Sequence, residues 1–137
     1  MKKVVFFVTM IAFAVLLCSC SGGITGEEAK TALNEFFTAV ESGDYTSAEK
    51  YLHPDHTGDL KAFFDSISES KNVEFSDITI EKYTGFSSAL YDSSVGGARY
   101  ELSVRLSLSG KGADAKFAFA KNDNGFGICD MYVRVDD

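Results

Sequence analysis

The sequence predicts an α+β domain in which N-terminal helices pack on one face of a four-stranded antiparallel sheet. Apolar residues recur every three or four positions between residues 25 and 70, which is typical of amphipathic helices. After residue 72 they alternate with polar residues, as in strands that have one buried and one wet face. Helices that precede all of the strands favour the α+β class, with the helices gathered on one face.

The first helix is expected to begin at Thr25 and to end before Gly43. Thr25 and Glu28 have the spacing of a capping box, in which a hydroxyl and a carboxylate bind the first free amides. Gly43 is a typical residue for the end of a helix. The inward-facing set is Ala29, Ala32, Leu33, Phe36, Phe37 and Val40.

Two shorter helices are expected next. Asp44 caps the second, which carries Tyr45, Ala48, Tyr51 and Leu52, and Pro54 prevents its continuation. Thr57 or Asp59 caps the third, whose inward-facing residues are Leu60, Phe63, Phe64 and Ile67.

Four strands follow in a meander. The first covers residues 73–80 with an irregularity at Ser76–Asp77, and the Ser- and Gly-rich stretch 84–97 is predicted to be a loop. The second strand, 98–108, alternates most clearly, and a turn at 110–112 leads to a return strand. A second turn at 122–125 precedes a last strand over 126–135. The inward positions are Ala98, Tyr100, Leu102, Val104, Leu106, Leu108, Ala113, Ala115, Phe117 and Phe119.

The last strand allows two alternations. If Phe126 and Ile128 face inward, strict alternation also turns Asp130 and Tyr132 inward. If the inward residues are instead Met131, Val133 and Val135, then Asp130 faces solvent. A bulge near Cys129 would reconcile the two halves. We expect a solvated Asp130, because an unpaired buried carboxylate is costly.

The opening segment has the features of an export signal. Lys2 and Lys3 precede an apolar run of fourteen residues, 4–17, whereas a helix needs about 20 residues to cross a bilayer. Leu17-Cys18-Ser19-Cys20 resembles the lipobox of bacterial lipoproteins. The resemblance implies cleavage between Ser19 and Cys20, a diacylglyceryl thioether (and palmitate-like acyl chains) at Cys20, and an envelope protein held on the membrane, facing outside the cytoplasm. An ordinary cleaved signal and an uncleaved anchor are the alternatives.

The predicted organisation is therefore a signal peptide over 1–19, a lipidated cysteine and short tether over 20–25, and a folded domain over 26–137. Ser21 would permit sorting to the outer membrane of a two-membrane cell. The formal net charge of −7 argues against nucleic acid as a partner and against docking on anionic lipid through a basic patch. Cys129 would be the one thiol left in the mature chain, and we expect it to be buried.

Several motifs of the domain resemble NTF2-like domains of the cystatin superfamily. Gly43-Asp44-Tyr45, Ala48 and the Leu52-His53-Pro54 end of the second helix are similar to the opening of such domains, and Gly125-Phe126-Gly127-Ile128 is similar to their last strand. The combination with a lipobox looks like DUF4878-like lipoproteins. The resemblance implies a sheet curled around the first helix into a cone, which holds a ligand, a catalytic site or only packed side chains.

Candidate site residues fall into two sets. An apolar ligand in the cone would meet Phe36, Phe37, Tyr51, Phe63, Tyr100, Phe117 and Phe119, although rings at such spacings more often form core. The leading expectation is a non-catalytic module without cofactor or metal, a monomer or weak dimer, that binds an apolar small molecule or an envelope protein. The alternative is a cavity enzyme that uses Asp130 with Tyr132, His53 or His56 as acid and base.

Overall fold

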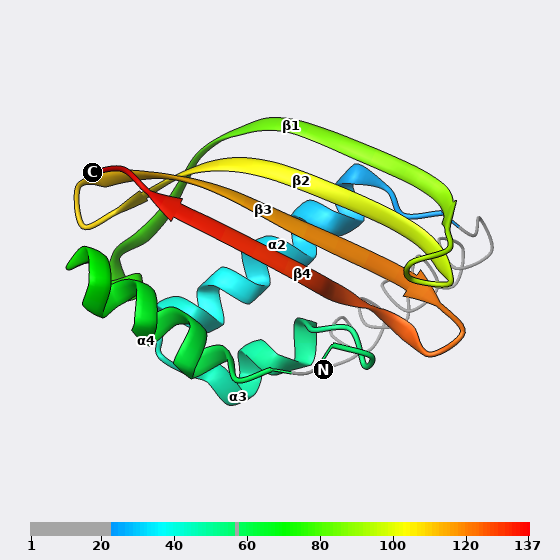
Figure 1. Ribbon diagram of the computed structural model, residues 1–137, viewed down its shortest axis with the longest axis horizontal. Coiled ribbons are helices and arrows are strands. Elements are labelled where there is room, and N and C mark those ends of the chain that lie inside the picture. The colour runs from blue at the N-terminus through cyan, green and yellow to red at the C-terminus, as the bar shows by residue number, and fades with distance from the viewer. Residues whose placement is uncertain (1–22, 57) are drawn as a thin grey trace, which may run out of the picture.

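The computed structural model describes residues 23–56 and 58–137 (Figure 1). The signal, the lipobox and Thr57 lie outside the described residues. The helical part consists of α2 (Gly26–Glu41), α3 (Tyr45–Ala48), the 3-10 turn η1 (Glu49–Tyr51) and α4 (Leu60–Lys71). After a further 3-10 turn, η2 (Phe75–Asp77), come β1 (Ile78–Asp92), β2 (Gly97–Leu108), β3 (Lys111–Asn122) and β4 (Gly125–Val135).

The four strands form one curved antiparallel sheet in the order β1-β2-β3-β4, and the helices lie against one of its faces. The predicted class and meander are confirmed. No helix in the described part of the chain is long and apolar enough to span a bilayer.

The helix ends follow from local chemistry. The Glu28 amide donates to Thr25 Oγ1 over 3.1 Å, and the Glu28 carboxylate accepts from the Thr25 amide over 3.4 Å, which completes the predicted capping box. Asp44 caps α3 and Asp59 caps α4. Gly43 follows α2 with a φ of 77°, a left-handed conformation that glycine adopts without strain.

The prediction of a loop over 84–97 is wrong. β1 continues to Asp92, and its turn into β2 takes up 93–96 alone. Three register shifts interrupt the pairing of β1 with β2, between Ile80 and Lys82, Tyr83 and Gly85, and Ala89 and Asp92. Most side chains after Gly85 are exposed, because β1 is an edge strand that extends past the helices. Because this part of β1 has no buried face, its apolar and polar residues do not alternate. Its strand conformation comes from backbone pairing with β2.

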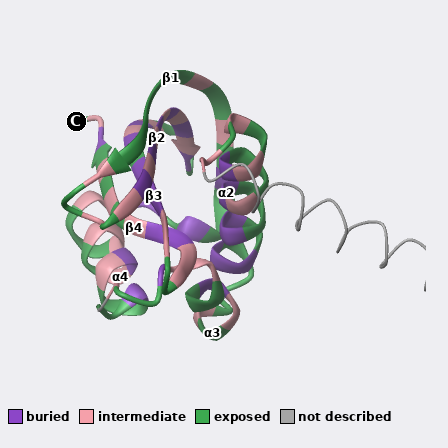
Figure 2. Cartoon of the chain, turned by 90° about the vertical axis from the view of Figure 1, so that its right-hand side faces the viewer, coloured by how far each residue is buried: buried purple, intermediate pink, exposed green. Residues whose placement is uncertain are grey.

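The core lies between α2 and the sheet, as the purple residues of Figure 2 show. Every second residue of β2 is buried, from Ala98 to Leu108, as predicted. α2 contributes Ala29, Leu33, Phe36, Phe37, Ala39 and Val40. On β3 the small outward-facing residues Ala118 and Ala120 are also buried, at 2% and 1% exposure, so neighbouring side chains cover part of the outer face.

A β-bulge divides β4 at Cys129. Phe119 pairs with Ile128 and Ala118 pairs with Asp130, so Cys129 has no partner on β3. Ile128 is thereby fully buried while Asp130 is exposed. The predicted bulge and the predicted solvation of Asp130 are both confirmed. The turn between β2 and β3 falls at Ser109–Gly110, two residues long, rather than at 110–112.

Candidate functional site

The aromatic residues expected around a ligand are mostly core. Phe117 on β3 contacts Phe37 of α2 with ring centroids 5.2 Å apart, and Phe36 lies 6.1 Å from Phe64 of α4. Phe36, Phe37, Tyr100, Phe117 and Phe119 are at most 7% exposed, while Tyr51 and Phe63 are partly buried at the margin of the core. The edge-to-face contact between Phe37 and Phe117 stabilises the packing of α2 on the sheet. The rings therefore fill the space that an apolar ligand would need.

His53 is the one buried polar side chain among the described residues, at 2% exposure. The Asp55 amide donates to its Nδ1 over 3.0 Å, so this nitrogen carries no proton. Its Nε2 then donates, and it lies 2.9 Å from Asn122 Oδ1 and 3.0 Å from the Gly125 carbonyl. The neutral ring is saturated with hydrogen bonds and joins the 53–56 turn to the β3–β4 turn.

Asn122 is the centre of this network. Its Nδ2 donates to the Asp55 carboxylate over 3.1 Å and to the Val95 carbonyl over 2.8 Å. Asn124 also donates to Asp55, over 2.9 Å. Three segments that are distant in sequence, the 53–56 turn, the β1–β2 turn and the β3–β4 turn, thus meet at one amide. We refer to His53, Asp55, Asn122 and Asn124 as the polar junction.

The 53–56 turn also binds the bulge of β4. The His53 amide donates to the Ile128 carbonyl over 2.9 Å, and Leu52 forms a parallel bridge with Ile128. His56 Nδ1 lies 3.1 Å from the Cys129 carbonyl, so this nitrogen carries the proton and donates it. The Ile128 and Cys129 carbonyls at the bulge are thereby hydrogen-bonded. With its Nδ1 donating, the His56 ring can accept a hydrogen bond at Nε2.

A pocket of about 350 Å³ opens on the outer face beside the polar junction. Ala120 lines it together with Arg99 of β2 and Asp130 of β4, the strands on either side of β3. The 53–56 turn and the β1–β2 turn complete the lining, which also includes Cys129. Arg99 pairs with Glu101 over 3.4 Å. We call this hollow the junction pocket.

The structure brings three of the four proposed acid–base residues together and separates the fourth. His53, His56 and Asp130 all line the junction pocket. His56 and Asp130 also line an adjoining pocket of about 450 Å³ against the first turn of α4. Tyr132 is 53% exposed and lies in a different hollow with Asp114 and Lys116. An Asp130–Tyr132 pair is therefore not formed. Asp130 and His56, in contrast, both line the two adjoining pockets, and we call this shared lining the His56–Asp130 wall.

Cys129 is partly buried. The sequence predicts a buried thiol, but the β4 bulge places Cys129 in the lining of the junction pocket. Desolvation raises the pKa of its thiol, and the nearby Arg99 guanidinium offsets this only in part. The thiol is consequently protonated at neutral pH and a weak nucleophile.

In the described part of the chain, no group of three or more His, Cys, Asp or Glu side chains lies close enough to hold a metal ion. Sequence reasoning missed Asn122 and Arg99. An Asn in a turn and an Arg on the wet face of a strand are ordinary at those positions, and no local signal distinguishes them.

The fold and the site define a small α+β domain with a filled core and a polar pocket on the outer face of its sheet. No protein-family model matches the chain, and no curated protein matches it. Among solved structures, the chain is similar to an NTF2-like protein of unknown function from Cytophaga hutchinsonii ATCC 33406. The two are 14% identical, the match covers 82% of this chain and 91% of the other, and the TM-score is 0.39.

Proposed function

We propose that the chain is a lipid-anchored lipoprotein of the bacterial cell envelope whose folded part, of the NTF2-like kind, is a non-catalytic binding or interaction module. The observation that carries the proposal is Leu17-Cys18-Ser19-Cys20 at the end of a fourteen-residue apolar run. Two or more acyl chains on Cys20 would hold the chain on a bilayer almost permanently. α2 begins at Gly26, so a short tether would keep the domain close to the membrane.

Three observations support a non-catalytic module. Aromatic side chains occupy the core where a cavity enzyme would bind its substrate. Asp130 is exposed on the outer face and does not point into the core that a cavity enzyme would use. The raised pKa of the Cys129 thiol disfavours a thiolate nucleophile. Binding would then use the outer surface and the junction pocket.

A second candidate is an enzyme that uses the His56–Asp130 wall, because these residues line both pockets on the outer face. His56 Nε2 has a lone pair for a proton, and Asp130 is a carboxylate within the same lining. A small polar substrate would fit better than an apolar one, since the junction pocket contains Arg99, Asp55 and Asn122.

The anchor is tested by expression of the full chain in a bacterium, with membrane fractionation and mass spectrometry of the mature N-terminus. Wild type is expected in the membrane fraction with a diacylglyceryl group on Cys20, and Cys20→Ala in the soluble fraction or uncleaved. Cys18→Ala is the matched control, because it removes a thiol two residues away and leaves the lipobox intact. A mature chain that starts elsewhere and carries no fatty acid would refute the anchor.

The binding role is tested by native mass spectrometry of the lipoprotein released from its own membranes in detergent. A small molecule that is retained by wild type and lost in Arg99→Ala would support a ligand in the junction pocket. A co-purified envelope protein would support an interaction module. Turnover of the retained molecule that Asp130→Asn abolishes would instead favour the enzyme.

A further inference from the structure

Three large apolar side chains are exposed near the end of β1. Phe86 is 69% exposed, Leu90 is 81% exposed and Tyr91 is 70% exposed. All three belong to the last seven residues of an edge strand that has one neighbour in the sheet, β2. Exposed apolar groups gathered in one short segment indicate an interaction surface. We call Phe86, Leu90 and Tyr91 the β1 tip.

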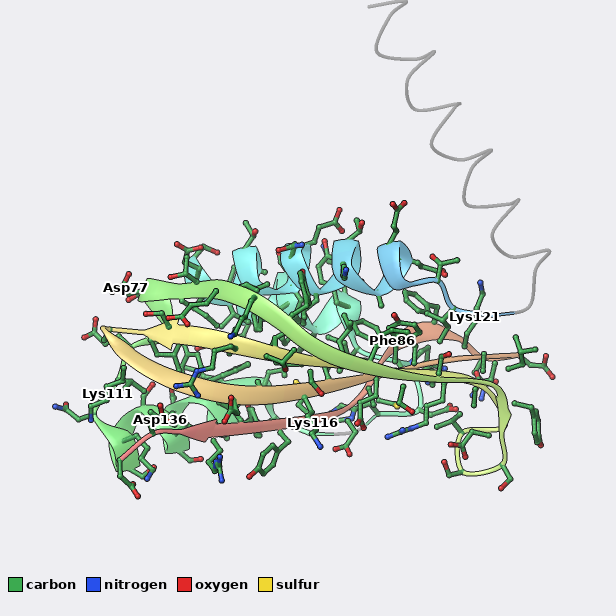
Figure 3. All side chains as sticks on the ribbon, turned by 90° about the horizontal axis from the view of Figure 1, so that it is seen from above. Asp77, Phe86, Lys111, Lys116, Lys121 and Asp136 are labelled. Carbon is green, nitrogen blue, oxygen red and sulfur yellow. The ribbon has the colours of Figure 1, made fainter. Side chains whose placement is uncertain are left out.

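The β1 tip lies where the described chain begins. A Cβ built on Gly23 would stand 3.1 Å from Leu90 Cδ2, so the backbone of Gly23 packs against Leu90. Lys121 Nζ donates to the Gly23 carbonyl over 3.3 Å and pairs with Glu28 over 3.5 Å. Figure 3 labels Phe86 and Lys121 at this end of the molecule, opposite Asp136. The entry of the chain is thus fixed beside the tip.

The tip is also joined to the first turn of α2. The Phe86 ring stacks on Tyr100 of β2 with centroids 5.7 Å apart and planes 4° from parallel. The Tyr100 hydroxyl in turn lies 2.9 Å from where a Cβ on Gly26 would be. Gly23, the β1 tip, β2 and the start of α2 are therefore linked by direct contacts, and we expect them to move as one unit.

The reach from Cys20 to the tip is short. Gly23 follows Cys20 by three residues, and three Cα–Cα steps span at most ~11 Å. A diacylglyceryl group on Cys20 would place that residue at the headgroup level of a bilayer. Leu90, in contact with Gly23, would then lie within reach of the interfacial region.

We propose that the β1 tip rests in the interfacial region of the bilayer that holds Cys20, so that the domain is attached at two points. This inference depends on the lipid anchor proposed above. Tyr, Phe and Leu are side chains that favour the boundary between headgroups and acyl chains. Two attachments fix the orientation of the domain, and the opposite end, with Asp136 and Asp137, points away from the membrane.

Charges beside the tip limit the depth of contact. Asp92 ends β1, and its carboxylate accepts from the amide and hydroxyl of Ser94 over 2.9 and 2.6 Å, which lowers its pKa. Asp123, on the neighbouring β3–β4 turn, is exposed. Both carboxylates stay in water and would be repelled by anionic headgroups. The contact is therefore shallow and stronger on zwitterionic than on anionic bilayers.

The test uses the absence of tryptophan from the chain. Leu90→Trp places the single indole of the chain in the tip, and Tyr91→Trp is a second variant. Tyr132→Trp is the matched control, since position 132 is exposed on the outer face and away from the tether. Each full-length lipidated variant is reconstituted in phosphatidylcholine vesicles with or without brominated acyl chains. Flotation and the mass at Cys20 are measured on the same samples.

The indole of Leu90→Trp is expected to emit at shorter wavelength than that of Tyr132→Trp, to lose emission with brominated lipid and to be protected from aqueous acrylamide. The indole of the control should show none of these effects. Floated, lipidated protein whose indoles at positions 90 and 91 are open to acrylamide and unaffected by bromine would overturn the tip contact and leave the anchor standing. Protection from acrylamide without bromine quenching would also overturn it, because protein would then cover the tip. A chain without lipid at Cys20 would overturn both proposals.

Discussion

The two ends of the sheet are built from different interactions. At the end where the chain enters, the hydrogen bonds of the polar junction, centred on the Asn122 amide, meet the exposed apolar side chains of the β1 tip. At the opposite end, Arg105 binds both Asp114 and Asp136, and Arg134 binds Asp114 over 3.2 Å. Lys71 at the end of α4 pairs with Asp137 over 2.9 Å. Figure 3 shows Asp77, Lys111 and Asp136 at this second end.

The contrast teaches that the two ends of one sheet can be stabilised differently, by a hydrogen-bond network at one end and by ion pairs at the other. Ion pairs between exposed side chains respond to salt and pH, and each contributes little to stability. The polar junction is partly buried and water does not reach the ring of His53, so losing one group leaves others unpaired. We therefore expect the stability of the end where the chain enters to depend on single residues, and that of the opposite end on its overall charge.

The largest effect is expected at His53. His53→Ala removes a fully packed ring and leaves the Asp55 amide and the Gly125 carbonyl without their partner. The free energy of unfolding should fall by about 2–4 kcal/mol, which denaturant titration would measure. His56→Ala is the control, since that ring makes one hydrogen bond, to Cys129, and should cost about 1 kcal/mol. Equal losses in the two variants would contradict a special role for the junction.

A smaller, pH-dependent effect is expected at the distal end. Arg105 lowers the pKa of both Asp114 and Asp136 below the ordinary value of about 3.9. Groups with a depressed folded-state pKa add stability above the unfolded pKa, and this stability is lost as pH falls through the folded pKa. The free energy of unfolding of wild type should therefore exceed that of Arg105→Met by the largest amount at neutral pH.

The advantage should shrink below about pH 4 and in high salt. Thermal unfolding of both variants across pH and salt would measure it. Arg134→Met is the milder control, because Arg134 forms an ion pair with Asp114 and acts on Asp136 through its charge without a direct bond. A difference that stays constant down to strong acid would show that Arg105 acts through packing of its stem.

Beside the polar junction, Cys129 should react slowly with iodoacetamide. Burial raises the pKa of its thiol, so little thiolate is present at neutral pH. The rate in the folded protein should rise at a higher pH than it does for a free cysteine, and should become normal in denaturant. Removal of the Arg99 charge by Arg99→Met should slow the folded-state reaction further. A faster reaction than that of free cysteine would indicate an activated thiol and revive the enzyme hypothesis.

The smallest effect on stability is expected at the exposed apolar residues. Leu90→Ser and Tyr132→Ser should each change the free energy of unfolding by less than about 0.5 kcal/mol, since both side chains are largely in solvent. Denaturant titration would check this. Destabilisation by Leu90→Ser alone would mean that its contact with Gly23 supports the fold, so the tip would be structural.

The sequence by itself determined the helices and the last three strands, and it offered a bulge that would reconcile the two halves of β4. Capping groups at Thr25, Asp44 and Asp59 act within one turn, and alternation along β2 reflects burial of one face. Such signals are local, so a single chain displays them. The bulge at Cys129 followed from two conflicting alternations that one extra residue reconciles.

The tertiary structure alone decided the length of β1 and the parts that Asn122, Val95 and Arg99 have in the site. The stretch 84–92 is a strand because β2 supplies backbone partners, and no pattern of side chains records that pairing. Asn122, His53, Asp55 and Val95 meet because three turns converge at one end of the sheet. Contacts between residues far apart in sequence, such as His53 with Gly125, 72 positions away, depend on how the chain folds back and not on its local order.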